Sequence, residues 1–369
     1  MCDVRIQHTQ TSVVIVTYNN RDDIDACLGS LQTYSPDTEI IVVDNLSFDG
    51  TLDHIRQQYP HVRAVSSGRN GGFGAGNNIG AGLATGTHLV FLNPDTEVQA
   101  GWLAPLIAAL DDPGVGLVTP TILLKGTADR VNTCGNVVHL TGLTFCAGLN
   151  EPAPPLSART MPVAAISGAA FVLRRTLWEQ LGGFDEQFFM YLEDTDLSLR
   201  ARRLGYTILH VPASRVWHDY RVSVSAAKLY HLERNRLLML RKNLSPATLA
   251  LLSPALALTE VLTWVFCLQH GKAYVWAKWR SYRSLWRGRR IVDRSARQPA
   301  PRYADHALVH SFSPRLALEQ MQRGVVATTA NYLLTVYYVV WRRIALFMLS
   351  DTGKNNATVT CAARYEYES

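Results

Sequence analysis

Short runs of β-branched and other apolar residues alternate with amphipathic segments along the first 120 residues. Runs this short and this rich in valine and isoleucine predict buried strands rather than helices; they occupy 12–17, 39–44, 62–66, 87–93 and 115–120. Between them apolar side chains recur at helical spacing, as in Ile24, Cys27, Leu28 and Leu31. Helices are therefore predicted at about 24–34, 51–59, 73–83 and 102–110.

This alternation predicts an α/β fold in which helices cover both faces of a mostly parallel, Rossmann-like sheet. Ligands of such sheets lie beyond the carboxyl ends of the strands. Polar side chains follow four of the predicted strands at that edge: Thr17, Tyr18 and Asn19; Asp44 and Asn45; Ser66 and Ser67; Asn93 and Asp95. We therefore expect the functional site there.

The pattern weakens after Pro120, and the composition changes again near Ser225. A proline-rich loop at 149–160 and a strand-like stretch at 163–175 precede a predicted helix whose first turn is acidic. We predict an α/β domain at 1–225, a helical and basic membrane-associating region at 226–350, and a disordered tail at 351–369.

Three features of the C-terminal region indicate a membrane surface. The segment 247–268 is long enough to cross a bilayer, but Pro254 and Glu260 leave open whether it spans, dips into or avoids the membrane. Ten Lys or Arg residues and several tryptophans and tyrosines fill 272–302, as in a helix lying on an anionic leaflet. A second apolar stretch, 331–349, is interrupted by two arginines and is also predicted to be interfacial.

Charge and cysteine usage narrow the class of protein. The formal charge of +6 favours an anionic partner such as nucleotide phosphates, nucleic acid or a membrane. The six cysteines show neither a CxxC pair nor zinc spacing, which favours a reducing compartment. The N-terminal residues lack the pattern of a signal peptide. We expect the protein at the cytoplasmic face of the plasma membrane, peripheral or monotopic.

Several residues have a structural as well as a functional interpretation. Asp44 either binds a ribose or base, or belongs to the cap of the next helix. The glycine-rich 68–80 permits close backbone approach to a ligand or simply a tight turn, and it is not a Walker A loop. Asp95 suits Mg²⁺ or Mn²⁺ beside a diphosphate, or caps a helix. The acidic turn at Glu193 is also what a helix dipole favours.

The motifs "VVIVTYNN", "IIVVDNLSFDGT", "NGGFGAGNN", "FLNPDTEV", "SGAAFVLRR" and "GGFDEQFFMYLEDTDLSLRARRLGY" occur in the order typical of one family. The first 220 or so residues resemble the family 2 inverting nucleotide-sugar glycosyltransferases of GT-A fold, especially rhamnosyltransferase-like members. The resemblance implies that the nucleotide is bound by Thr17, Tyr18, Asn19, Asp44, Asn77 and Asn93. It also implies that Asp95, with His218, holds the metal; His218 has an equally good structural interpretation.

In this family the acidic pair lies beside the acceptor, which implies that Asp194 is the general base, with Glu193 next to it. An inverting transfer requires a base that removes the acceptor proton during in-line attack, and an aspartate near its ordinary pKa is ionised at neutral pH. Gly168 and Asp196 are expected to contact the acceptor.

The sequence therefore predicts an inverting, metal-dependent glycosyltransferase that makes cell-surface polysaccharide. Its expected donor is dTDP-rhamnose or a UDP-sugar, and its expected acceptor is a glycan or a polyprenyl-diphosphate-linked glycan at the inner membrane surface. The alternatives are a sugar nucleotidyltransferase and a membrane- or nucleic-acid-binding protein driven by the basic segment; we expect no nucleic acid. "VTYNN" lacks the glycine-rich, basic phosphate loop that a nucleotidyltransferase would need.

Overall fold

Twelve short and long strands build the sheets of the protein. The computed structural model describes residues 11–220, 223–287, 305–316 and 325–351. The strands in these ranges are β1 (Thr11–Thr17), β2 (Glu39–Asp44), β3 (Arg63–Ser66), β4 (His88–Leu92), β5 (Thr96–Val98), β6 (Val115–Leu124), β7 (Val131–Thr133), β8 (Asn136–Val138), β9 (Thr144–Cys146), β10 (Met161–Pro162), β11 (Ala170–Arg174) and β12 (Thr207–His218).

Helices follow most of the strands and dominate the C-terminal part as far as the structure describes it. They are α1 (Ile24–Tyr34), α2 (Thr51–Gln58), α3 (Gly72–Leu83), α4 (Leu103–Ala109), α5 (Arg175–Leu181), the 3₁₀ turn η1 (Glu186–Phe188), α6 (Glu193–Arg203), α7 (Ala226–Asn243), α8 (Pro246–Leu251), α9 (Ser253–His270), α10 (Lys272–Arg287), α11 (Asp305–Ser311) and α12 (Val325–Asp351). The predicted helices of the first 110 residues all form, within a few residues of the expected bounds.

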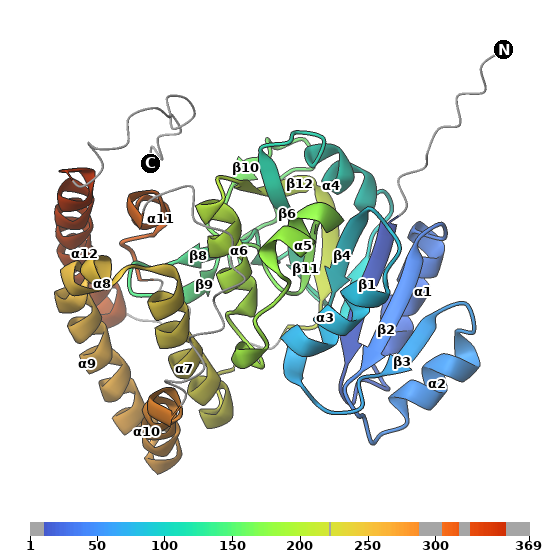
Figure 1. The fold of residues 1–369 in the computed structure, drawn as a ribbon, viewed down its shortest axis with the longest axis horizontal. Coiled ribbons are helices and arrows are strands. Elements are labelled where there is room, and N and C mark those ends of the chain that lie inside the picture. Colours follow the sequence, from blue (N-terminus) through green and yellow to red (C-terminus); the bar gives the residue numbers. More distant parts are fainter. Residues whose placement is uncertain (1–10, 221–222, 288–304, 317–324, 352–369) are drawn as a thin grey trace.

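The main sheet has the order β10-β12-β6-β11-β4-β1-β2-β3, with β5 on β12 and β7 on β6 (Figure 1). The four strands β3, β2, β1 and β4 are all parallel. Alternate side chains of β1 enter two cores: Val13 and Ile15 pack with α1, whereas Val14 and Val16 face the side of α3, α5 and α6. Burial of both faces explains the continuous apolar runs of these strands. The predicted α/β fold class is confirmed.

The other half of the sheet is mixed, because β11 is antiparallel to both β4 and β6. The strand-like stretch 163–175 forms a strand only over β11, and the residues before it cross the carboxyl edge of the sheet. β12 returns parallel to β6 and ends at His218, which brings that residue to the same edge as the end of β4.

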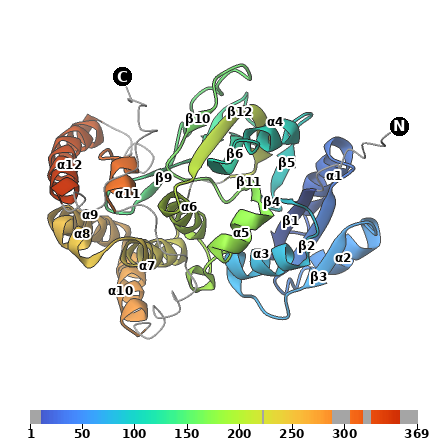
Figure 2. The same ribbon diagram turned by 45° about the horizontal axis from the view of Figure 1, so that its top comes forward.

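The C-terminal helices pack against the α/β part through a shared apolar core. This core contains Val138 and Leu140 near β8, Leu199 of α6, Leu238 of α7 and Tyr338 of α12. In Figures 1 and 2, α9 and α12 lie at the end of the molecule farthest from α2, and α7 lies between them and the sheet.

The apolar segment 247–268 forms α8 and most of α9, and its one charged residue is paired inside the protein. Glu260 forms ion pairs with Arg236 and, at 3.0 Å, with Lys278. Among the described residues, only Asn331–Leu349 is long and apolar enough to cross a membrane, judged by length and composition alone. The basic segment lies in α10 as far as Arg287; its remainder and the predicted disordered tail lie outside the described residues.

Candidate active site

A large cavity of about 1280 Å³ opens at the carboxyl edge of the sheet. Small-molecule sites usually measure about 300–1,000 Å³, so this one has room for more than one small ligand. Its walls include these predicted site residues: Thr17, Tyr18, Asn93, Asp95, Gly168, Glu193, Asp194 and His218. The strand ends and the acidic turn, far apart in sequence, therefore meet in one place.

Asp95 and His218 lie side by side in this cavity. His218 Nδ1 is 2.9 Å from Asn132 Oδ1, and its Nε2 is 3.5 Å from Asn93 Nδ2. An amide oxygen accepts and an amide NH₂ donates, so these neighbours fix the hydrogen on Nδ1 and leave Nε2 unprotonated, with a lone pair that the Asn93 amide approaches only at 3.5 Å. Nε2 is 3.3 Å from Asp95 Oδ1, which is buried and accepts no hydrogen bond from the described residues. A carboxylate oxygen and an imidazole nitrogen are thus adjacent and available as ligands.

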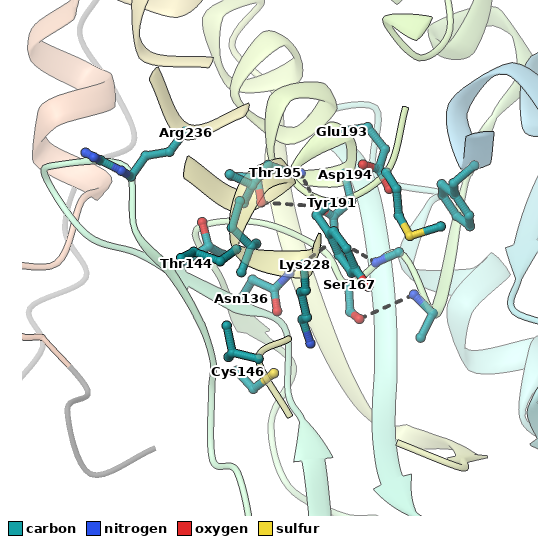
Figure 3. A pocket seen from close by; sticks show the side chains of 18 of the residues that line it. Asn136, Thr144, Cys146, Ser167, Tyr191, Glu193, Asp194, Thr195, Lys228 and Arg236 are labelled. Atoms are coloured by element: carbon teal, nitrogen blue, oxygen red, sulfur yellow. Dashed lines mark hydrogen bonds between the residues drawn. The ribbon is translucent and has the colours of Figure 1, made fainter. Parts of the chain in front are cut away.

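Asp194 is held by donors on both of its carboxylate oxygens (Figure 3). Oδ2 accepts from the backbone N–H of Gly168 at 2.8 Å and from Asn136 Nδ2 at 3.3 Å, and Oδ1 accepts from the N–H of Thr195 at 2.6 Å. Burial raises the pKa of Asp194, and these hydrogen bonds offset only part of that rise. The expectation of an ordinary pKa is therefore wrong, although the orientation suits a base.

Glu193 lies in the same cavity wall but in a drier position. Its side chain is buried, and Oε2 has no hydrogen-bond partner among the described residues. Burial and the neighbouring charge of Asp194 raise the pKa of Glu193 well above its ordinary value. Two adjacent carboxyl groups with raised pKa values ionise one at a time, and the better-solvated Asp194, with more donors, is the one that ionises first.

Asp196 does not reach the cavity, and the predicted contact with the acceptor does not fit its position. Its carboxylate is fully buried and bonds Arg200, Lys242 and Asn243, each at 2.8 Å. Burial alone would raise the pKa of Asp196, but the charges of Lys242 and Arg200 lower it. This side chain joins α6 to α7 and thereby positions the helix that carries Asp194.

The residues predicted to bind the nucleotide divide into two groups. Thr17, Tyr18 and Asn93 line the cavity, whereas Asn19, Asp44 and Asn77 do not. Asp44 accepts from Thr17 Oγ1 at 3.0 Å and from the N–H of Ser47 at 2.9 Å, so it holds the loop after β2 against the end of β1.

Asn77 is buried in α3, and its Nδ2 donates to the carbonyl of Phe73 at 3.0 Å. Its predicted contact with the nucleotide does not fit this position. Asn45, which directly follows Asp44, does line the cavity; its Nδ2 donates to the carbonyl of Gly72 at 3.0 Å, and its buried Oδ1 has no partner among the described residues.

The glycine-rich segment contributes Asn70, Gly72 and Phe73 to the cavity wall, and two of its glycines also permit close packing. Gly72 has φ +83°, and a Cβ there would lie 2.1 Å from the carbonyl oxygen of Phe189. A Cβ on Gly80 would lie 2.4 Å from a methyl group of Val14 on β1. These glycines therefore let α3 approach the sheet and the loop before Asp194 closely.

That loop has an unusual backbone conformation. Phe189, Tyr191 and Leu192 all have positive φ, between 62° and 69°, which disfavours side chains other than glycine. Asn235 of α7, fully buried, holds the loop: its Nδ2 lies 2.9, 2.8 and 2.8 Å from the carbonyl oxygens of Phe188, Met190 and Tyr191.

Sequence reasoning missed Asn132, Asn136, Lys228 and Asn235. The first two lie in and beside short strands after Pro120, where the periodic pattern is weak. Lys228 and Asn235 belong to α7, beyond the boundary predicted for the α/β domain. Asparagine and lysine are common on protein surfaces, so residue type alone could not have identified these four as site residues.

Comparisons with known proteins agree with the site. Residues 12–137 match the profile of glycosyl transferase family 2, and residues 88–229 match that of glycosyl transferase family group 2. A structure of GalNAc-T7 with UDP, GalNAc and Mn²⁺ has the same fold, with a TM-score of 0.50 and 24% identity over 57% of this chain and 43% of that chain.

Two sequence relatives are rhamnosyltransferases. The N-acetylglucosaminyl-diphospho-decaprenol L-rhamnosyltransferase of Mycobacterium tuberculosis (strain ATCC 25618 / H37Rv) is 30% identical over 246 residues, which cover 60% of this chain and 79% of the relative. Rhamnosyltransferase WbbL of Escherichia coli (strain K12) is 27% identical over 249 residues, or 63% of this chain and 93% of that protein. These matches confirm the resemblance, and the chain belongs to glycosyltransferase family 2, as an inverting enzyme of GT-A fold.

Proposed function

We propose that this enzyme transfers a sugar, with rhamnose favoured, from a nucleoside-diphosphate sugar to a hydroxyl of a lipid-linked glycan during cell-surface polysaccharide synthesis. The observation that carries the proposal is that Asp95 and Asp194 line the same cavity. A diphosphate site and a base site must share one space if the acceptor hydroxyl is to attack opposite the leaving group. Had the two lain on separate surfaces, the reaction would have no site.

Asp194 is proposed as the general base. The N–H of Gly168, the N–H of Thr195 and the amide of Asn136 fix the direction of its carboxylate. Fixed donors of this kind hold a base in place without a cost of reorganisation during the reaction. The acceptor hydroxyl gives its proton to Asp194 as its oxygen bonds to the anomeric carbon, and the bond to the nucleoside diphosphate breaks on the opposite face.

The residues present fit a divalent cation. No group of three or more His, Cys, Asp or Glu side chains suited to a metal occurs in the part of the chain that the structure describes. Asp95 Oδ1, buried and without a donor, and His218 Nε2 can together supply two ligands. Mg²⁺ and Mn²⁺ sites in phosphate-transfer proteins commonly have few protein ligands, with phosphate oxygens and water completing them. Bound there, the cation would neutralise the charge on the leaving diphosphate.

The relatives support the choice of substrates. The names of both relatives described above specify rhamnose transfer, and the mycobacterial name also specifies a diphospho-decaprenol acceptor. The GalNAc-T7 structure contains a uridine nucleotide and Mn²⁺. We propose a rhamnose donor, dTDP-rhamnose in particular, with a UDP-sugar as the second candidate.

An exposed apolar face supports association with the cytoplasmic side of the membrane. α12 exposes several large apolar side chains three or four residues apart: Tyr332, Leu333, Val336, Val340, Ile344, Phe347 and Met348. α10 exposes Trp276, Trp279 and Trp286. Tryptophans together with a broad apolar face are typical of helices that lie in a membrane interface.

Asp194→Asn tests the proposed base. The amide keeps the size of the side chain and can still accept from Gly168, but it cannot take the acceptor proton. We expect nucleotide-sugar binding, measured by thermal shift with Mn²⁺, to persist while transfer falls by about 10²–10⁴-fold. Asp185→Asn, which changes a carboxylate outside the cavity, is the matched control. Turnover of Asp194→Asn at the wild-type rate would exclude Asp194 as the base.

A further inference from the structure

The catalytic cavity extends well beyond the residues needed for sugar transfer. Past Asp194 it continues between the β8–β9 hairpin on one side and α7 and α9 on the other. This extension, here called the apolar arm, is lined mainly by Leu143, Phe145, Leu229, Leu232, Leu262 and Phe266. Its α9 wall runs from Thr259 to Gln269, about 15 Å at 1.5 Å per residue.

One cation stands where the apolar arm joins the catalytic centre. Lys228 lines the cavity in the turn of α7 before Leu232, and its amine lies 5.3 Å from the ring centre of Tyr191 and 5.5 Å from that of Tyr220. Figure 3 shows its side chain extending into the pocket near Cys146, on the same side as Asn136. Burial lowers the pKa of Lys228, and no carboxylate in the described part of the chain offsets this effect.

The other charges of the apolar arm are already neutralised. Arg236 and Glu233 both line it, but Arg236 pairs with Glu233 and Glu260, and Lys278 pairs with the same two carboxylates. Two cations and two anions therefore cancel inside the protein. Lys228 remains as the partly buried positive charge of the arm with no counter-ion among the residues that the structure describes, which is a condition that an anionic ligand would relieve.

The apolar arm also reaches an exposed apolar strip on α9, which packs against α10, one of the two helices that we propose to face the membrane. Val265 lines the cavity and is 45% exposed, so the arm opens along α9 at this residue. Its neighbours on the exposed side, Val261 and Leu268, are large apolar residues too, 58% and 67% exposed. A chain leaving the cavity at Val265 therefore remains on apolar surface.

We propose that the apolar arm binds the lipid of the acceptor, with Lys228 holding its phosphate group and the first isoprene units packed between α7 and α9. This inference rests on the proposed glycosyltransferase function, since it assigns a site to the acceptor of that reaction. A sugar at Asp194, an anionic group at Lys228 and an apolar chain beyond it follow one another in the order in which a lipid-diphosphate sugar presents them. Binding of the lipid in the apolar arm would thus position the acceptor sugar beside Asp194.

Binding of farnesyl diphosphate to the full chain in detergent tests the site without any sugar transfer. By isothermal titration we expect farnesyl diphosphate to bind more tightly than either farnesol or inorganic pyrophosphate. Lys228→Met should weaken the binding of farnesyl diphosphate by about tenfold or more, which is the usual effect of losing a hydrogen bond to a charged group. The affinity for farnesol should not change. Lys272→Met, an exposed lysine of α10, is the matched control and should behave as wild type.

Filling the apolar arm tests its apolar part. Leu262→Trp should weaken the binding of both farnesyl diphosphate and farnesol, whereas Ala257→Trp, at an exposed position of α9 outside the cavity wall, should weaken neither. Leu143→Trp fills the arm from the opposite wall and replaces Leu262→Trp if that variant does not fold. Titration with UDP plus Mn²⁺ in each variant verifies that the nucleotide side is intact.

Three results would overturn the inference. Equal farnesyl diphosphate binding by the arm-filling variants and Ala257→Trp would exclude the apolar arm. Loss of UDP binding in Lys228→Met, with farnesyl diphosphate unaffected, would assign Lys228 to the donor instead. Transfer by wild type to a soluble glycan, without measurable lipid binding, would refute both the lipid site and the lipid-linked acceptor, and would leave the proposed sugar transfer at Asp194 standing.

Discussion

Replacing Asp196 by asparagine separates a structural role from a role in acceptor binding. The wild-type carboxylate is fully buried and bonded to Arg200, Lys242 and Asn243. An asparagine keeps one acceptor oxygen but turns an NH₂ group toward donors that previously faced a carboxylate. The two cations then lose a shared counter-charge inside the protein.

The structure sets the expected size of the effect. Removing one partner of a buried ion pair costs about 3–5 kcal/mol of stability. The lower end applies here, because Lys242 still has Asp185 at 2.8 Å and Arg200 still donates to the carbonyls of Leu181 and Gly183. We expect a loss of about 3 kcal/mol, which corresponds to a fall of roughly 4 °C in Tm for a chain of 369 residues.

The assay is thermal and urea denaturation together with steady-state kinetics well below Tm. The pKa of Asp196 is lowered in the folded protein, so its stabilising effect is complete above the ordinary value of 3.8 and disappears as pH falls through the lower folded value. The difference between wild type and Asp196→Asn should therefore shrink in strong acid. Asp185→Asn, which touches the same Lys242, should cost less than about 1 kcal/mol. A wild-type Tm with a raised acceptor KM would refute the structural role and restore acceptor binding.

Four further predictions concern the site and the membrane face. Because the base must be ionised and the pKa of Asp194 is raised, kcat/KM should fall on the acid side of its pH profile with a midpoint above pH 3.8, the ordinary pKa of an aspartate. Asn132→Leu should weaken the binding of Mn²⁺ in the presence of UDP by about 10–100-fold in isothermal titration, because His218 loses the acceptor that fixes its tautomer. Asn136→Leu is the control: Asn136 does not contact His218, so this variant should bind Mn²⁺ as wild type does. Gly72→Ala places a Cβ 2.1 Å from the Phe189 carbonyl and should lower Tm and kcat together, whereas Gly29→Ala, with nothing within 4 Å, should lower neither. Aspartates at Leu333, Val336 and Phe347 should move the protein from the membrane pellet to the soluble fraction; an unchanged distribution would contradict the proposed membrane face.

The parallel half of the fold was predictable because its information is local. Strands such as β1 are apolar on both faces, and α1 has its apolar residues at helical spacing, so each pattern specifies its element without knowledge of the rest. The carboxyl ends of parallel strands lie at one edge of a sheet, so the sequence also predicted that Thr17, Asn93 and Asp95 lie close together. The structure confirms this, since all three line one cavity. The strands β5 and β7–β10 have only two or three residues each, and their pairing depends on distant partners.

Burial of charge was the feature that sequence patterns could not resolve. Asp196 and Asp194 stand two residues apart in the same helical turn, yet one is fully buried among cations and the other lines the cavity. Glu260 interrupts an apolar run and left open whether 247–268 spans, dips into or avoids the bilayer, because its partners Arg236 and Lys278 come from two other helices. Only the packing of α7, α9 and α10 distinguishes these cases.

The position of α7 argues that the compositional boundary near residue 225 does not separate two independent units. α7 supplies Asn235, which satisfies the carbonyls of the strained loop before Asp194, and Lys242, which neutralises Asp196. Each buried polar group left without its partner costs about 1–3 kcal/mol, so a chain ending at 225 would lose the geometry of its catalytic helix. A chain ending after Asn243 would keep these contacts and lose α8–α12 only. The membrane-facing helices are therefore coupled to the catalytic base through α7, because the same helix contacts the loop on one side and α10 on the other.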